Sequence, residues 1–193
     1  MGNKNWALSC LNVRRGKILF EGEFLILPKV YSAFISNYEL GSETDLFNSL
    51  RVQTDSKPEP VTIRWENSRE NNPWKIEGDR LLGMTTTEDL RYEIKEYHQK
   101  IEVWHQSGMI KIGWTHGDLI LLGLESDKLD KIFIYGESSD NGEFYEIAEN
   151  VFSMFAKIEL VPDEQLLDFY KVDLNGLSKD WGSNYWKKTT YLE

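Results

Sequence analysis

Several residue types and patterns that would identify a protein class are scarce in this sequence of 193 residues. Its single cysteine, Cys10, cannot form a disulfide within the chain, as is typical of proteins in a reducing compartment. Its three histidines, His98, His105 and His116, are spaced unlike any compact metal-binding motif. Its longest apolar runs, such as residues 119–122, are far shorter than the ~20 residues that span a bilayer. We therefore expect a cytoplasmic protein with no membrane partner, no metal and no cofactor.

The motifs of common enzyme classes are also missing. The sequence contains no Gly-x-Ser-x-Gly elbow, no Walker loop and no dinucleotide-binding glycine fingerprint. His116 and Asp118 flank Gly117 and could form an acid/base pair, but neighbours in sequence rarely face one site together, so a turn is favoured. Cys10 could act as a nucleophile only with a histidine near it in space. The sequence alone thus gives little support for a catalytic function.

Charge, by contrast, is plentiful and unevenly distributed. The chain has 22 basic and 32 acidic side chains and a net charge of -10. Residues 137–168 hold nine acidic side chains and one basic one, a charge of -8, whereas residues 1–20 carry only four bases. The negative charge of residues 137–168 attracts a basic partner and repels the phosphates of nucleic acid. The alternative is that these carboxylates form one solvated helix face.

Hydrophobic periodicity predicts an α+β protein. Residues 28–41 and 147–158 have helical spacing, as does a segment that begins within 85–87 and runs to 97, and 163–170 could form a short fourth helix. Strands are predicted at 18–26, 119–124 and 131–135, and a hairpin at 101–105 and 110–114, around Gln106-Ser107-Gly108. Short connections favour antiparallel pairing. We expect one domain, residues 1–193, with a central antiparallel sheet over 101–135 that is covered by helices from both ends of the chain.

Four segments together resemble the SUKH superfamily, the Smi/Knr-type domains of bacterial toxin-immunity proteins and of a fungal cell-wall regulator. Residues 27–38 are similar to the family's opening Leu-Pro helix, and 112–122 to its central strand, Gly-Asp turn and next strand. Residues 131–135 and 147–155 resemble its edge strand and a helix near the domain's end. The resemblance covers residues 22–160 in the right order. Residues 161–193 form a C-terminal extension, whose tail from Trp181 to Trp186 either packs on the core or joins a partner surface.

The resemblance implies a non-enzymatic immunity protein that binds and neutralises a cognate polymorphic toxin, often a nuclease. An acidic inhibitor suits such a partner, because nuclease toxins are commonly basic. The residues expected to contact the toxin are acidic and lie in or near the acidic segment's first half: Glu137, Asp140, Glu143, Glu146 and Glu149. The alternatives are a Smi/Knr-like regulatory scaffold in cell-wall or signalling assemblies, and a small enzyme that uses His116 and Asp118.

Overall fold

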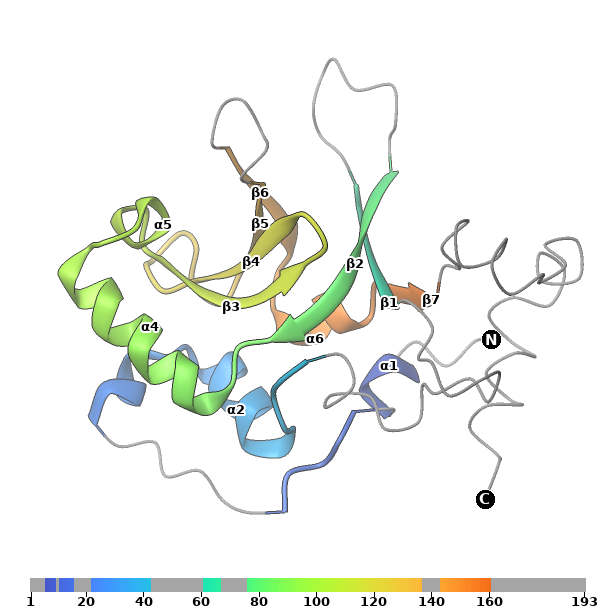
Figure 1. Ribbon diagram of the computed structural model, residues 1–193, viewed down its shortest axis with the longest axis horizontal. Helices are drawn as coiled ribbons and strands as arrows, with labels where there is room; N and C mark the ends of the chain where they lie inside the picture. The colour runs from blue at the N-terminus through green and yellow to red at the C-terminus, as the bar shows by residue number, and fades with distance from the viewer. Residues whose placement is uncertain are drawn as a thin grey trace, which may run out of the picture.

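The protein has an antiparallel sheet and several helices, as the α+β prediction requires (Figure 1). The computed structural model describes residues 6–9, 11–15, 22–42, 61–66, 76–136 and 143–160. Its strands are β1 (Val61–Glu66), β2 (Ile76–Met84), β3 (Met109–Thr115), β4 (Asp118–Gly123), β5 (Ile132–Gly136), β6 (Phe144–Ala148) and β7 (Ile158–Leu160). They are arranged in the order β6-β5-β4-β3-β2-β1-β7. Strands β2 to β6 form one continuous five-stranded antiparallel sheet, and β1 pairs with both β2 and β7.

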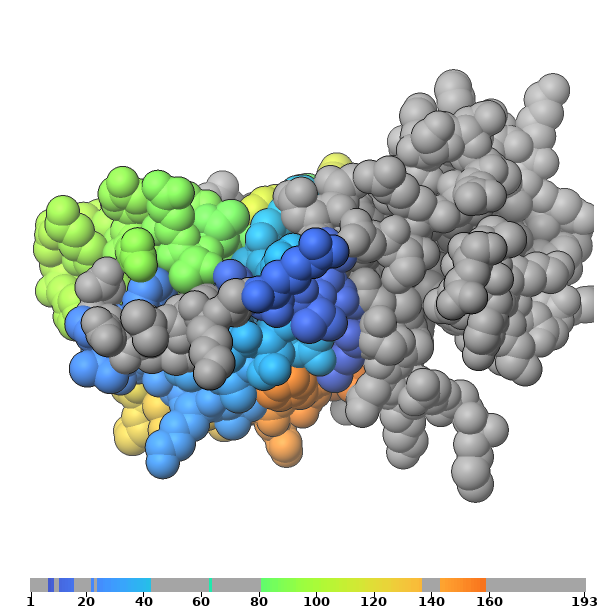
Figure 2. Space-filling model, turned by 90° about the horizontal axis from the view of Figure 1, so that it is seen from below, coloured from blue at the N-terminus to red at the C-terminus, as the bar shows by residue number. Residues whose placement is uncertain are grey.

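Most of the described helices cover one face of this sheet. They are α1 (Trp6–Ser9), the 3-10 helix η1 (Gly22–Ile26), α2 (Lys29–Asn37), α4 (Thr87–Gln99), α5 (Val103–Gln106) and α6 (Val151–Phe155). Figure 1 shows α1, α2, α4 and α6 beneath the strands, and Figure 2, which views the molecule from below, shows α4 (green), α2 (light blue) and α6 (orange) on that side. Among the described residues, no helix combines the length and the apolar character needed to cross a membrane.

Alternation along the strands divides the buried residues between the two faces. On β4, Ile120 and Leu122 belong to the main core beneath the helices, whereas Leu121 belongs to a smaller cluster with Met109 and Phe133. Successive side chains of a strand point to opposite faces, so the smaller cluster lies on the face away from the main core. The sheet is therefore apolar on both sides.

Two predicted helices are confirmed, and local sequence explains their ends. Helix α2 follows Pro28 and buries Tyr31, Phe34 and Ile35, which are spaced to share one face. Helix α4 begins after Thr86, whose hydroxyl accepts a hydrogen bond from the Asp89 amide at 3.1 Å. Helix α4 is capped at its C-terminal end by Lys100, whose φ of 53° lies in the left-handed region.

Two predicted strands are wrong where the structure describes them. Residues 22–26 of the first form η1, and its residues 18–21 lie outside the described part. Residues 101–105 were predicted as half of a hairpin, but Val103–Gln106 is the short helix α5. A capping box starts this helix: the Glu102 side chain accepts from the His105 amide, and the His105 ring accepts from the Glu102 amide. A pair of side-chain hydrogen bonds thus overrides the alternating pattern.

The predicted helix 147–158 is only five residues long in the structure. Ile147 and Ala148 end β6, and Ile158 begins β7, so both ends of the apolar stripe are paired as strands. The Asn150 side chain starts α6 by accepting from the Ser153 amide at 3.0 Å. Strands β1, β2 and β7 were not predicted, whereas β3, β4 and β5 were. The turn signal at 138–142 predicted either a hairpin with a strand at 144–147 or a strand-to-helix turn, and the strand, β6, is what forms. The predicted helix 163–170, the turn 138–142 and the tail from Trp181 to Trp186 lie outside the described residues.

Candidate functional site

The acidic residues expected to contact a partner lie around β6. Glu143, Glu146 and Glu149 are all exposed, on the strand or beside it, whereas Glu137 and Asp140 lie outside the described residues. Glu146 pairs with Lys131, whose Nζ lies 2.9 Å from Oε2. Glu143 accepts a hydrogen bond from the Tyr145 hydroxyl. None of the three is part of a helix, so the alternative of a solvated helix face is wrong for these three residues.

Glu146 borders a row of aromatic rings on the sheet face away from the main core. The Tyr135 ring of β5 stacks on Phe144 of β6, with centroids 5.1 Å apart. The Trp104 ring of α5 lies 5.9 Å from Tyr135 on its other side. Glu146 pairs with Phe133 across the ladder, and Phe144 pairs with Tyr135, so Glu146 and Phe144 share this face. We call Trp104, Tyr135 and Phe144 the aromatic row.

All three rings of the aromatic row are only half-buried. They pack over the fully or almost fully buried Met109, Leu121 and Phe133, and so are partly exposed above an apolar floor. A Tyr in such a position combines a rigid apolar ring with a polar atom that can reach a partner. Centres of protein interfaces are enriched in rings of this kind.

Trp104 is held in place by the carboxylate of Glu93. Glu93 lies on the buried side of α4 and is 5% exposed. Its Oε1 atom accepts from Trp104 Nε1 at 2.9 Å, lies 2.9 Å from His105 Nε2, and accepts from the Lys111 amide at 2.7 Å. Three donors around one oxygen satisfy a buried negative charge that would otherwise be very costly. The indole therefore has a fixed orientation at one end of the aromatic row.

His105 is fully buried and uses both of its ring nitrogens. Nδ1 accepts a hydrogen bond from the Glu102 amide at 3.1 Å, so this nitrogen carries no proton. Nε2 then carries the proton and donates to Glu93. Because neither nitrogen has a free lone pair, His105 acts in this arrangement as a structural link and not as a metal ligand or base.

A second polar group supports the same helices from the exposed side. The Tyr97 hydroxyl donates to Glu125 at 2.9 Å, and Lys100 Nζ lies 3.4 Å from the same carboxylate oxygen. Lys100 also donates to the His105 carbonyl at 2.8 Å. The pKa of the Glu125 carboxyl is lowered, mainly by the hydrogen bond from Tyr97 and to a lesser degree by Lys100. The pKa of Tyr97 is raised, mainly by burial and to a lesser degree by its hydrogen bond to Glu125.

The residues considered for metal binding or catalysis are not gathered at one place. His98 lies exposed on α4, His105 is buried on α5, and His116 is exposed in the turn between β3 and β4. That turn is closed by Thr115, whose Oγ1 accepts from the Asp118 amide at 3.0 Å. In the described part of the chain, no three His, Cys, Asp or Glu side chains are placed to hold a metal ion. Cys10 lies outside that part.

Comparison with protein-family models, with curated proteins and with solved structures found no match. The aromatic row was missed in the sequence, although one signal was available. Phe133 and Tyr135 alternate along β5 and so had to share a face. Trp104 could not be placed on that face, because the residues around it were predicted to form a strand.

Proposed function

We propose that this chain is a non-enzymatic immunity protein that binds and neutralises a cognate bacterial polymorphic toxin in the cytoplasm. The observation that carries the proposal is the half-buried aromatic row with Glu146 beside it on the same sheet face. Aromatic anchors at the centre and charged groups at the rim are the usual anatomy of a binding surface between proteins.

The proposed partner is a basic protein, and a nuclease is the toxin that the charge fits best. The net charge of -10 and the exposed carboxylates of Glu143, Glu146 and Glu149 would attract such a protein and speed its association. Inhibition would be steric and electrostatic: the bound immunity protein occupies the surface with which the toxin approaches its substrate. No group of this chain needs to perform chemistry in that mechanism.

The resemblance to the SUKH superfamily supports the same proposal. Its four segments fall, in chain order, on described elements: 27–38 on α2, 112–122 on β3 and β4, 131–135 on β5, and 147–155 on β6 and α6. Most apolar residues of these segments pack into the two buried clusters. The resemblance therefore concerns the core. The face that binds a partner is proposed from the aromatic row and Glu146 beside it.

The test is a protection assay with the product of the gene immediately upstream of this one. That product is expressed in a sensitive bacterium with and without this chain, and a pull-down measures binding directly. We expect protection, and we expect Tyr135→Ala or Phe144→Ala to weaken binding at least tenfold, as is common for a buried aromatic anchor. The matched control is Tyr92→Ala, which removes an exposed tyrosine from α4.

The outcomes separate the proposed classes of protein. If the upstream product is not toxic and is not bound, the immunity function is wrong, and the regulatory scaffold of the Smi/Knr kind becomes the better proposal. If binding is intact in both aromatic variants, the function stands but the aromatic row is not the contact surface. Replacing His116 with Ala tests the enzyme alternative, which is dismissed if protection is unchanged.

A further inference from the structure

Two rings of the aromatic row, Tyr135 and Phe144, belong to a longer line of side chains that crosses the sheet. Trp114 of β3 pairs with Leu119 of β4, Leu119 pairs with Tyr135 of β5, and Tyr135 pairs with Phe144 of β6. Residues that pair directly share a face of the sheet, with their Cβ atoms about 5 Å apart. All four side chains are half-buried, on the face away from the main core. We call Trp114, Leu119, Tyr135 and Phe144 the cross-strand row.

The row ends at β2, where a glycine makes room for the Trp114 ring. Gly83 pairs with Trp114, and a Cβ at Gly83 would lie 2.6 Å from that ring. The indole therefore packs directly against the backbone of β2. Because Gly83 has no side chain, β2 adds nothing at this position that would rise above the ring.

The spacing of the row fits an α-helix laid across the strands. Neighbouring strands lie about 4.8 Å apart, so the three intervals between the four side chains extend over about 14 Å. Apolar side chains on one face of a helix recur about every 5.4 Å, once per turn, so four of them extend over about 16 Å. Side chains on one face of a β-strand recur about every 6.7 Å, and four of them need about 20 Å. A helix can therefore stay close to the whole row, whereas a strand laid in the same direction cannot.

Charge at the β6 end of the row indicates the kind of helix. Glu143, Glu146 and Glu149 are exposed there, and Glu146 shares the face of the row. The ion pair between Glu146 and Lys131 is exposed at both residues, and pairs of this kind contribute little free energy. A cation of the partner can therefore join or replace Lys131 at low cost. Electrostatic complementarity favours a helix that places Lys or Arg over β6.

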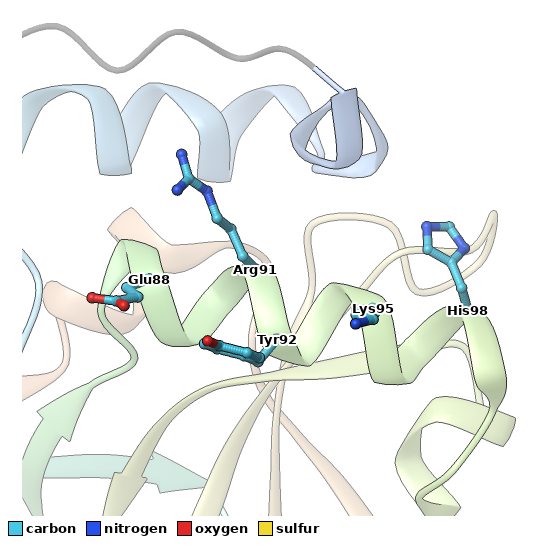
Figure 3. Close-up of a pocket in the computed structure, with 5 residues that line it drawn as sticks. All are labelled: Glu88, Arg91, Tyr92, Lys95 and His98. Atoms are coloured by element: carbon cyan, nitrogen blue, oxygen red, sulfur yellow. The ribbon is translucent and has the colours of Figure 1, made fainter.

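The exposed side of α4 differs from the cross-strand row in the character of its side chains (Figure 3). Four of the five labelled residues, Glu88, Arg91, Lys95 and His98, are charged or polar. The fifth, Tyr92, projects from a different side of the helix than Arg91 and His98 do. Single exposed apolar side chains are ordinary on protein surfaces, whereas a contiguous apolar patch with a polar border is typical of a binding surface.

We propose that the cross-strand row binds a basic amphipathic α-helix of the partner protein. The apolar side of that helix lies on Trp114, Leu119, Tyr135 and Phe144, and its Lys and Arg residues lie over β6. About ten residues of helix cover the row, at 1.5 Å per residue. Recognition of an amphipathic helix by an apolar surface is a recurrent mode of protein binding. The inference rests on the proposed function only for the identity of the partner, the toxin.

The test uses two peptides of about 15 residues that contain the same numbers of Leu and Lys. In the first, Leu recurs at the alternating spacings of three and four residues that give an amphipathic helix. In the second, Leu and Lys alternate, as on a strand with one apolar face. Each peptide is titrated into the full chain in a calorimeter. We expect the helical peptide to bind at least about tenfold more tightly than the alternating one.

Substitutions in the row locate the binding. Leu119→Gln should weaken binding of the helical peptide about tenfold, because it removes one apolar contact and changes no charge. Trp114→Thr should do the same, and Thr is well suited to a strand. The matched control is Leu129→Gln, which removes an exposed leucine from the turn between β4 and β5. Circular dichroism melting would establish that each variant is folded.

Two results would overturn the proposal directly. One is equal binding of the two peptides, and the other is equal binding of the helical peptide by Leu119→Gln, Trp114→Thr and Leu129→Gln. Sedimentation of the chain alone gives a third: a dimer that Leu119→Gln dissociates would mean that a second copy covers the row.

Competition separates this proposal from the proposed function. The helical peptide should displace the product of the upstream gene from the chain. If both bind without competing, the row is not the toxin surface, and the immunity function stands. If the protection assay fails while the helical peptide binds as expected, the immunity function is wrong, and the row remains a helix-binding surface for another basic protein.

Discussion

The carboxylate of Glu93 on α4 accepts a hydrogen bond from the backbone amide of Lys111 on β3, at 2.7 Å. Strand β2 last pairs with β3 where Met84 meets Gly113, so Lys111 lies beyond the end of its neighbouring strand. The Thr85 amide makes the last backbone contact on that side, to the Ile112 carbonyl at 2.8 Å. A side chain therefore replaces a missing strand partner and satisfies an otherwise unpaired amide.

Removal of this carboxylate should be strongly destabilising. In Glu93→Ala the Lys111 amide, the Trp104 indole and the His105 ring lose their common acceptor. We expect the free energy of unfolding to fall by about 3 kcal/mol, measured by urea denaturation. Glu96→Ala, on the exposed side of the same helix, should change it by less than about 0.5 kcal/mol. Equal effects of the two substitutions would show that the buried network is not stabilising.

Loss of the Tyr31 hydroxyl should have the opposite effect. This group is fully buried, and its oxygen has no hydrogen-bond partner among the residues that the structure describes. Tyr31→Phe removes an unsatisfied polar atom and keeps the ring, so the free energy of unfolding should rise by about 1 kcal/mol. Tyr97→Phe is the control, because its hydroxyl donates to Glu125, and this variant should be no more stable than the parent. A loss of stability in Tyr31→Phe would indicate a bound water at that oxygen.

Alkaline pH provides a second measurement on Tyr31. Burial raises the pKa of this phenol above its ordinary value of about 10. A group whose pKa is raised on folding contributes its full stability below its unfolded pKa and loses it as the pH rises further. We therefore expect the parent protein to lose stability above about pH 10 faster than Tyr31→Phe does. Urea denaturation curves recorded between about pH 8 and pH 11, on either side of the ordinary tyrosine pKa, would measure the difference.

Gly83 should not tolerate even one added carbon atom. A Cβ at this position would lie 2.6 Å from the Trp114 ring and 2.7 Å from the Gly41 carbonyl oxygen. Gly83→Ala should therefore cost about 1–3 kcal/mol of stability by overpacking, measured by thermal or urea unfolding. The comparison is Gly22→Ala, where nothing lies within 4 Å and only the positive φ of 59° opposes a side chain. That variant should lose about 1 kcal/mol. If the two costs are the same, the close contact at Gly83 relaxes freely.

Charge reversal beside β6 should affect the rate of toxin binding more than the fold. Glu143→Lys with Glu146→Lys replaces two exposed carboxylates, one of them paired with Lys131. Association with a basic toxin should slow about tenfold at low salt and become less dependent on ionic strength, as stopped-flow mixing would measure. The control is Glu88→Lys with Glu96→Lys, which changes the net charge equally on α4. A matching loss in both double variants would mean that net charge, and not this surface, governs association.

The sequence predicted the elements whose patterns follow from burial alone. Helices α2 and α4 carry apolar stripes and clear ends, and β3, β4 and β5 consist largely of apolar residues. The predicted helix 147–158 was wrong because one apolar stripe there serves two strands and a short helix. Its residues Ile147, Val151 and Ile158 all reach the same core, so burial alone does not reveal the change of structure.

The candidate site was less predictable, because it depends on contacts between distant residues. Glu93 has no signature of burial, since a charged residue on a helix is usually solvated. Its three donors come from residues 11, 12 and 18 positions later in the chain. The alternating pattern of 101–105 indicated a strand and so hid the position of Trp104. The residues of a protein-binding surface come from different strands, so no sequence pattern marks them until the pairing of the strands is known.

The bond from Lys111 to Glu93 also has a kinetic consequence. Lys111 and Glu93 are only 18 positions apart in the sequence. The hydrogen bond between them therefore joins α4, α5 and the start of β3 into one unit that is held by contacts between residues close in sequence. Because Lys111 donates to a buried carboxylate, its amide hydrogen cannot exchange with solvent until that unit opens. We expect this amide to exchange as slowly as those between β3 and β4, although its partner is a side chain.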